Sequence, residues 1–173
     1  MSASLSRYKQ LTLAIVKQRA QKAQTLIERV GFLDPDRANS KHDEIQLWVY
    51  DNLPKVLGEF SAAGNQVFVQ TKHLEYPLLQ VEKNFTNIVG FIDLVATGYV
   101  THNNEFIKSY SAALEIKTVI PCIGDLVRQI NFYRRHQATS FVWLVVSPDD
   151  RFQKVLSEQG IYFFKYPVSG QLF

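Results

Sequence analysis

Three charged residues lie inside apolar stretches in the middle of the chain: Asp93, Glu115 and Lys117. Asp93 lies in the stretch 88–95, and Glu115 and Lys117 lie in the stretch 112–119. Both stretches are short and bounded by polar turn residues, which predicts buried β-strands. A charged side chain inside such a strand is costly unless another group pairs with it. Two acids and one lysine are the groups that can hold a divalent metal against a phosphate.

The register of the two strands decides whether the two acids can meet. Residues two apart in a strand share a face, so Glu115 and Lys117 should point the same way. Directly opposed residues of an antiparallel pair also share a face. A two-residue loop at Asn103-Asn104 would set Asp93 opposite Leu114, whereas a three-residue loop or a β-bulge would set it opposite Glu115. The site therefore requires an odd loop or a bulge between the strands.

Two carboxylates in one small site repel one another, which favours a cation between them. Oxygen ligands suit Mg²⁺ or Mn²⁺, which keep several waters and accept a substrate phosphate oxygen as a ligand. Lys117 would orient the attacking water or stabilise the developing negative charge. The alternative is that Glu115 and Lys117 form a charged pair that only keeps a sheet soluble. The presence of Asp93 in the preceding strand, at a register that fits Glu115, favours the metal site.

Three segments follow one another along the chain: GFID at 90–93, LEIK at 114–117 and RQINFY at 128–133. Together they resemble the PD-(D/E)XK nuclease superfamily. The expected element order from Ser40 to Val146, α-β-β-β-α-β, is similar to the core of that family. One departure is that Ile92, and not proline, precedes Asp93.

The resemblance implies a restriction-endonuclease-like fold and metal-dependent hydrolysis of DNA phosphodiesters. Asp93 and Glu115 would then be ligands of Mg²⁺ or Mn²⁺, and Lys117 would be the catalytic lysine. Gln129 and Tyr133 are similar to a Gln-x-x-x-Tyr motif that follows the Glu-x-Lys strand in the RecB-like branch.

Glu44 is a candidate for a fourth acidic member, as catalytic residue and metal ligand. It lies in the first turn of a helix expected to begin after Ser40, where several branches of the superfamily, such as Holliday-junction resolvases, place an acidic ligand. Trp48 follows one turn later and predicts that this helix face points inward. The alternative is that Glu44 only favours the helix dipole.

The helix expected at 126–137 should carry both site and DNA-binding residues. Gln129 and Tyr133 share one helix face. From this face, Gln129 could hold a DNA phosphate or lie near a metal-bound water. The alternative is an amphipathic helix in which Tyr133 is partly core. The basic residues of this helix that we expect to contact phosphates, together with Tyr133, are Arg128, Arg134 and Arg135. A merely solvated basic face is the alternative for the three arginines.

The bulk composition sets wider limits. With 173 residues, 46% of them apolar, the chain is large enough for one compact domain, and its net charge of +3 permits a nucleic-acid partner. The only cysteine is Cys122, which excludes an internal disulfide or a cysteine zinc site and fits a reducing cytoplasm. The first ten residues lack the apolar core of a signal peptide, and no stretch reaches the ~20 apolar residues of a membrane span. The histidines show no metal spacing and are interpreted as structural or surface residues: His42, His73, His102 and His136.

Periodicity predicts an N-terminal helix and connector at 1–39 and one nuclease domain at 40–173. Within that domain we expect strands at 66–79, 85–100, 106–119, 141–146 and 161–166, and helices after Ser40, at 126–137 and at 151–159. The predicted fold class is α/β, a mixed sheet with helices on its faces.

The sequence therefore predicts a Mg²⁺-dependent DNA endonuclease. A RecB-like exonuclease, a resolvase of branched DNA, and a catalytically idle nucleic-acid-binding protein on the same fold remain alternatives. Because each chain carries one site, cutting both strands of a duplex would favour a homodimer.

Overall fold

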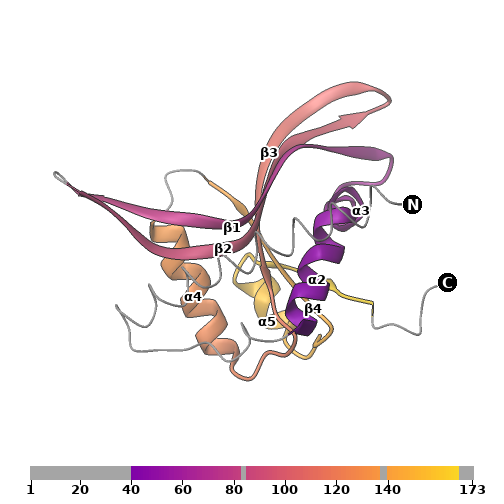
Figure 1. Cartoon of the computed structure of the whole chain (residues 1–173). Helices are drawn as coiled ribbons and strands as arrows, with labels where there is room; N and C mark the ends of the chain where they lie inside the picture. Colours follow the sequence, from indigo (N-terminus) through magenta and orange to yellow (C-terminus); the bar gives the residue numbers. More distant parts are fainter. Residues whose placement is uncertain (1–39, 83–84, 137–139, 168–173) are drawn as a thin grey trace, which may run out of the picture.

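The structure, a computed structural model, describes residues 40–82, 85–136 and 140–167 (Figure 1). The N-terminal helix and connector expected at residues 1–39 lie outside these ranges.

One five-stranded mixed sheet forms the centre of the described structure, with its strands in chain order. The first three strands pair antiparallel, and the last three pair parallel. The strands are β1 (Asn65–Glu82), β2 (Phe85–His102), β3 (Glu105–Ile116), β4 (Val142–Ser147) and β5 (Tyr162–Lys165). The predicted α/β class with a mixed sheet is confirmed.

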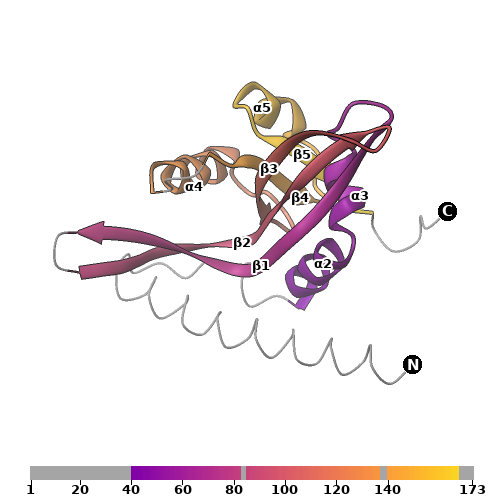
Figure 2. The ribbon, with the colours of Figure 1, turned by 90° about the horizontal axis from the view of Figure 1, so that it is seen from above.

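Helices cover both faces of the sheet (Figure 2). On one face lie α2 (Ser40–Asp51) and α3 (Leu53–Gly58), while the crossover helices α4 (Ile123–Arg135) and α5 (Gln153–Glu158) lie on the other. The even-numbered buried residues of β3 and β4 pack on α2 and α3, and the odd-numbered ones pack on α4 and α5. No helix of the described ranges is long and apolar enough to cross a bilayer.

The hairpin between β2 and β3 carries the predicted bulge. Its loop is two residues long, with Asn103 and Asn104 in the left-handed region at φ 51° and 67°, as a tight hairpin turn requires. Ile107 is an extra residue in β3, and beyond it the register shifts so that Leu94 faces Leu114. The three-residue loop is therefore wrong and the bulge is confirmed.

The long strands β1 and β2 separate from the sheet near the candidate site. The β2–β3 ladder ends at Leu94↔Leu114, whereas β1 and β2 stay paired as far as Glu82↔Phe85. Both strands therefore extend beyond the sheet as a two-stranded arm on the side of α4 (Figures 1 and 2). A Cβ at Gly90 would lie 3.1 Å from the Tyr133 ring, so the close approach of this arm to α4 favours glycine.

Candidate functional site

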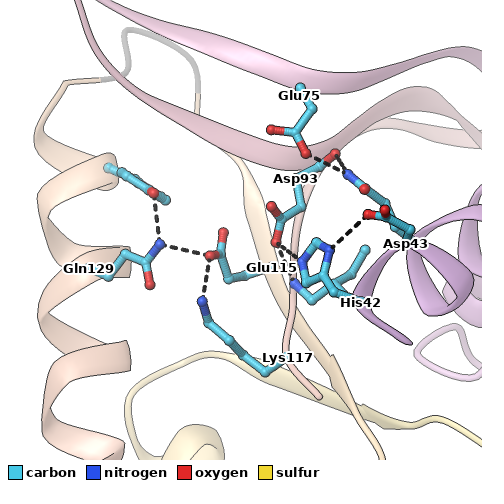
Figure 3. A network of polar contacts seen from close by, with 10 residues as sticks. His42, Asp43, Glu75, Asp93, Glu115, Lys117 and Gln129 are labelled. Carbon is cyan, nitrogen blue, oxygen red and sulfur yellow. Dashed lines mark hydrogen bonds and ion pairs between the residues drawn. The ribbon is translucent and has the colours of Figure 1, made fainter. Parts of the chain in front are cut away.

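The candidate site lies where β2 leaves β3. Asp93 comes directly before the last β2–β3 pair, and its side chain is buried, with 2% of the residue exposed. The backbone N–H of Ile116 donates a 2.8 Å hydrogen bond to Asp93 Oδ2. The carboxylate thus takes the place of a strand partner for this N–H, which fixes it beside Glu115 (Figure 3).

Glu115 lies in β3 and Lys117 directly after its end, and the two side chains meet, as the sequence predicts. Glu115 has no exposed surface, and Lys117 Nζ lies 3.2 Å from Glu115 Oε1. Gln129 Nε2 of α4 donates to the same oxygen at 2.7 Å. The backbone N–H of Lys117 donates to Val146 O at 3.0 Å, which continues the parallel ladder and holds the lysine in line. The structure therefore brings Asp93, Glu115, Lys117 and Gln129 together (Figure 3).

Tyr133 lies behind Gln129 and not on a surface open to DNA. Only 5% of Tyr133 is exposed, and its hydroxyl accepts a 2.8 Å hydrogen bond from Gln129 Nε2. The partly-core alternative therefore describes Tyr133 in this structure, and its contact with DNA stays a prediction. Its observed contact orients the amide that holds Glu115.

His42 is a residue of the site that the sequence interpretation did not identify. It is buried, with Nε2 at 3.5 Å from Asp93 Oδ2 and Nδ1 at 3.8 Å from Asp43 Oδ1. His42 and Gln46 are four residues apart and share a face of α2 between the apolar residues of its core. Two polar residues on an otherwise apolar helix face are the signal that could have identified His42 and Gln46.

Gln46 and Glu75 complete the polar group on the side of α2 and β1. Gln46 Nε2 donates to Asp93 O at 2.8 Å and to Glu75 Oε1 at 3.0 Å. Glu75 is buried and has a left-handed backbone, with φ 49°. In the sequence it alternates with Leu74 and Tyr76, which is typical of a solvent-facing strand position, so no local pattern indicates its burial.

Glu44 does not join this group. It is exposed, and its Oε1 accepts a 3.5 Å hydrogen bond from Tyr166 OH. Burial, followed by the charge of Glu44 and this hydrogen bond, raises the pKa of Tyr166. The inference from Trp48 fails because Trp48 packs on Tyr166, on the β5 side, whereas His42 lies about 200° around the helix from Glu44.

The three arginines of α4 have different environments. Arg134 donates to Gln159 O at 3.3 Å and Gly160 O at 3.0 Å, so it holds the C-terminal end of α5 and is not available as a phosphate contact in this arrangement. Arg128 is exposed and pairs with Asp125 on its own helix. Arg135 is exposed. Only Arg128 and Arg135 therefore remain as solvent-facing candidates for DNA contacts.

The segment after Lys117 is tied to the end of β4. Ile120 N–H donates to Asp149 Oδ2 at 2.9 Å, and Arg151 donates to Asp149 and, at 3.2 Å, to Ile120 O. The hydrogen bond from Arg151 holds the pKa of Asp149 well below its usual range. This network anchors the segment between Lys117, which directly follows β3, and Gln129 on α4.

The donor set suits a hard divalent cation. Among the described residues, no three His, Cys, Asp or Glu side chains converge closely enough to hold a metal by themselves. Two carboxylates from neighbouring strands nevertheless match the way Mg²⁺ binds proteins, since it keeps waters and takes substrate phosphate as a further ligand. Asp93 and Glu115 are the residues that would hold it.

Comparison with known proteins gives no relative. No family model, curated protein or solved structure matches the chain. The inference of function therefore depends on the side chains of the site.

Proposed function

We propose that this chain is a metal-dependent nuclease that hydrolyses DNA phosphodiester bonds. The observation that carries the proposal is the buried pair Asp93 and Glu115, on neighbouring strands, with Lys117 3.2 Å from Glu115. Two acids in one buried site repel one another, which favours a bound cation. Mg²⁺ or Mn²⁺ would supply Lewis-acid polarisation of the phosphodiester and activation of water.

Each side chain has a separate role in this proposal. Asp93 and Glu115 hold the cation, with Asp93 oriented by Ile116 N–H and Glu115 oriented by Gln129. Lys117 stabilises the negative charge that develops on the phosphate or orients the attacking water. Gln129 acts through Glu115, and we infer a positioning role for it.

The fold supports the same proposal. The described elements follow the order α2, β1, β2, β3, α4, β4, apart from the short α3, and this is the order expected of a restriction-endonuclease-like core. We propose that core for the chain. His42, whose Nε2 lies 3.5 Å from Asp93 Oδ2, adds an imidazole on α2 that orients the Asp93 carboxylate from the helix side.

The alternatives within this chemistry are an exonuclease and a resolvase of branched DNA. A catalytically idle nucleic-acid-binding protein is the alternative outside it, and the intact set of two acids and a lysine argues against that. Because the described part of the chain carries one such site, we propose that a homodimer would be needed to cut both strands of a duplex.

A cleavage assay tests the proposal. The protein is incubated with linear, closed circular, single-stranded and branched DNA, in Mg²⁺, in Mn²⁺ and in EDTA. An endonuclease cuts the closed circle, an exonuclease needs an end, and a resolvase prefers the branch. Absence of metal-dependent cleavage of all four DNAs would reject the nuclease function.

Variants assign the activity to the site. Asp93→Asn and Glu115→Gln should each reduce cleavage about 1,000-fold, because metal catalysis supplies several kcal/mol of barrier reduction. Glu44→Gln, on the same helix as His42 but facing Tyr166, is the matched control and should cleave at the wild-type rate. Equal losses in all three variants would show that the assigned site is wrong.

A further inference from the structure

The amide of Gln46 connects three elements of the candidate site. Gln46 is buried on α2, and its Nε2 donates one hydrogen to Asp93 O on β2 and the other to Glu75 Oε1 on β1. Both donor hydrogens of the amide are therefore used, and each acceptor lies on a different strand. The amide fixes the helix to both strands at the point where β2 leaves β3.

The two hydrogen bonds at Asp93 act on opposite parts of the residue. Its side chain is held by Ile116 N–H at 2.8 Å, and its main chain is held by Gln46 at 2.8 Å. No β3 residue pairs with the β2 backbone in the described ladder beyond Leu94. Gln46 therefore supplies a constraint on the Asp93 backbone where the β2–β3 ladder no longer does.

Glu75 is placed to orient Gln46. It lies opposite Asp93 in the β1–β2 register, between the pairs Leu74↔Leu94 and Tyr76↔Ile92. Its left-handed backbone, with φ 49°, is a strained conformation for a residue other than glycine. Such strain persists only where the surrounding contacts determine the conformation, and it concentrates at functional sites.

Core packing alone does not explain an amide at position 46. Gln46 Oε1 is buried and accepts no hydrogen bond from the part of the chain that the structure describes. A buried oxygen without a donor lowers stability, and leucine or methionine of similar size would avoid this loss. The presence of glutamine therefore favours a role for its two donated hydrogen bonds.

We infer that Gln46 is a positioning residue for Asp93, and that Glu75 is the outer partner that orients Gln46. The inference rests on the proposed cation site, and it adds to that site two residues that do not themselves hold the cation. Residues that orient metal ligands typically change metal affinity 10–100-fold when they are replaced.

Mn²⁺ binding measured by calorimetry on the purified protein tests the inference. Gln46→Leu and Gln46→Met, which keep the volume but remove both hydrogen bonds, should weaken Mn²⁺ binding about 10–100-fold in protein that circular dichroism shows to be folded. Glu75→Gln keeps an oxygen for Gln46, so its Mn²⁺ affinity should stay within a few-fold of wild type. Glu75→Ala should lose as much Mn²⁺ affinity as Gln46→Leu. Glu44→Gln is the control and should bind like wild type.

Two results would overturn the positioning role. Unchanged Mn²⁺ affinity in both Gln46 variants would show that Asp93 does not need the amide. A loss of Mn²⁺ affinity in Glu75→Gln as large as that in Glu75→Ala would show that the charge of Glu75 itself binds the cation.

A metal-free measurement separates this inference from the proposed function. His42 Nε2 lies 3.5 Å from Asp93 Oδ2, so its imidazole nitrogen NMR signals report the position of that carboxylate. Glu75→Ala, which leaves the sequence of α2 unchanged, should shift these signals in the absence of metal, and Glu44→Gln should not. A wild-type protein that binds no Mn²⁺ and cleaves no DNA rejects the nuclease, while unshifted His42 signals reject the positioning role.

Discussion

Replacement of Lys117 by methionine separates the stability of the site from its activity. Lys117 Nζ lies 3.2 Å from Glu115 Oε1, with 11% of the lysine side chain and none of the glutamate side chain exposed. Methionine keeps most of the apolar stem of lysine and removes its charge. The variant therefore leaves a buried carboxylate without its lysine partner.

The distance gives the size of the effect. At 3.2 Å and an effective dielectric constant of about 20, the attraction is about 5 kcal/mol before desolvation is subtracted. Removal of one partner of a buried pair typically lowers the free energy of unfolding by about 3–5 kcal/mol. For a domain of this size, 1 kcal/mol corresponds to about 2–4 °C, so the unfolding temperature should fall by roughly 6–20 °C.

Thermal unfolding with and without Mn²⁺ is the assay. Because Lys117 no longer repels a cation next to Glu115, Mn²⁺ should raise the unfolding temperature of the variant more than that of wild type. Cleavage should still fall about 100–1,000-fold, as expected when one group that stabilises developing charge is removed. The matched control is Lys165→Met, since Lys165 forms an exposed pair with Asp150 at 2.7 Å and its loss should leave the unfolding temperature almost unchanged.

The reasoning would be refuted by a Lys117→Met protein that unfolds at the wild-type temperature without metal. Equal Mn²⁺ stabilisation of variant and wild type would show that the cation does not bind beside Glu115. Wild-type cleavage by the variant would remove Lys117 from the proposed mechanism.

Two further predictions concern the helix α4 and the loop before it. If Arg135 contacts a phosphate, Arg135→Ala should weaken DNA binding in a filter-binding titration and lower the salt slope of that binding by roughly one unit. Arg134→Ala should instead lower the unfolding temperature and leave the salt slope of DNA binding unchanged. Since Arg151 lowers the pKa of Asp149, this carboxylate stabilises the folded state above its unfolded pKa of about 4, and that stabilisation is lost as the pH falls towards the lower folded pKa. Asp149→Asn should therefore lower the free energy of unfolding by about 1 kcal/mol at pH 7, because Ile120 N–H loses a charged acceptor. In urea titrations, the difference in free energy of unfolding between variant and wild type should become smaller below about pH 4.

The secondary structure was largely predictable because its signals are local. The continuous apolar stretch of β2 and the Asn103-Asn104 turn indicate a hairpin, and the helix between β3 and β4 has a clear apolar face. The requirement that Asp93 and Glu115 share a face also predicted an irregularity in that hairpin. The bulge at Ile107 meets it, although no local pattern favours that position over its neighbours.

The environment of the site was only partly predictable because it depends on three-dimensional neighbours. Trp48 indicated an inward face for Glu44, but α2 buries a wide arc, and Trp48 and His42 contact different strands. Periodicity gives the buried arc of a helix but not the strand that each part of the arc meets. The same limit applies to α4, where Arg134 donates to the carbonyls of Gln159 and Gly160, directly after α5 and about 25 residues away in the sequence.

The bulge and the site are connected through the register of one strand pair. Side chains alternate faces with a period of two, so a shift by one residue moves a whole strand segment to the other face. Without the extra residue at Ile107, the two-residue turn would set Asp93 opposite Leu114, whose side chain lies in the core under α2 and α3. With it, the ladder reaches Leu94↔Leu114 and ends, which leaves Asp93 next to Glu115. An irregularity at one end of the hairpin therefore determines which side chains meet at the other end.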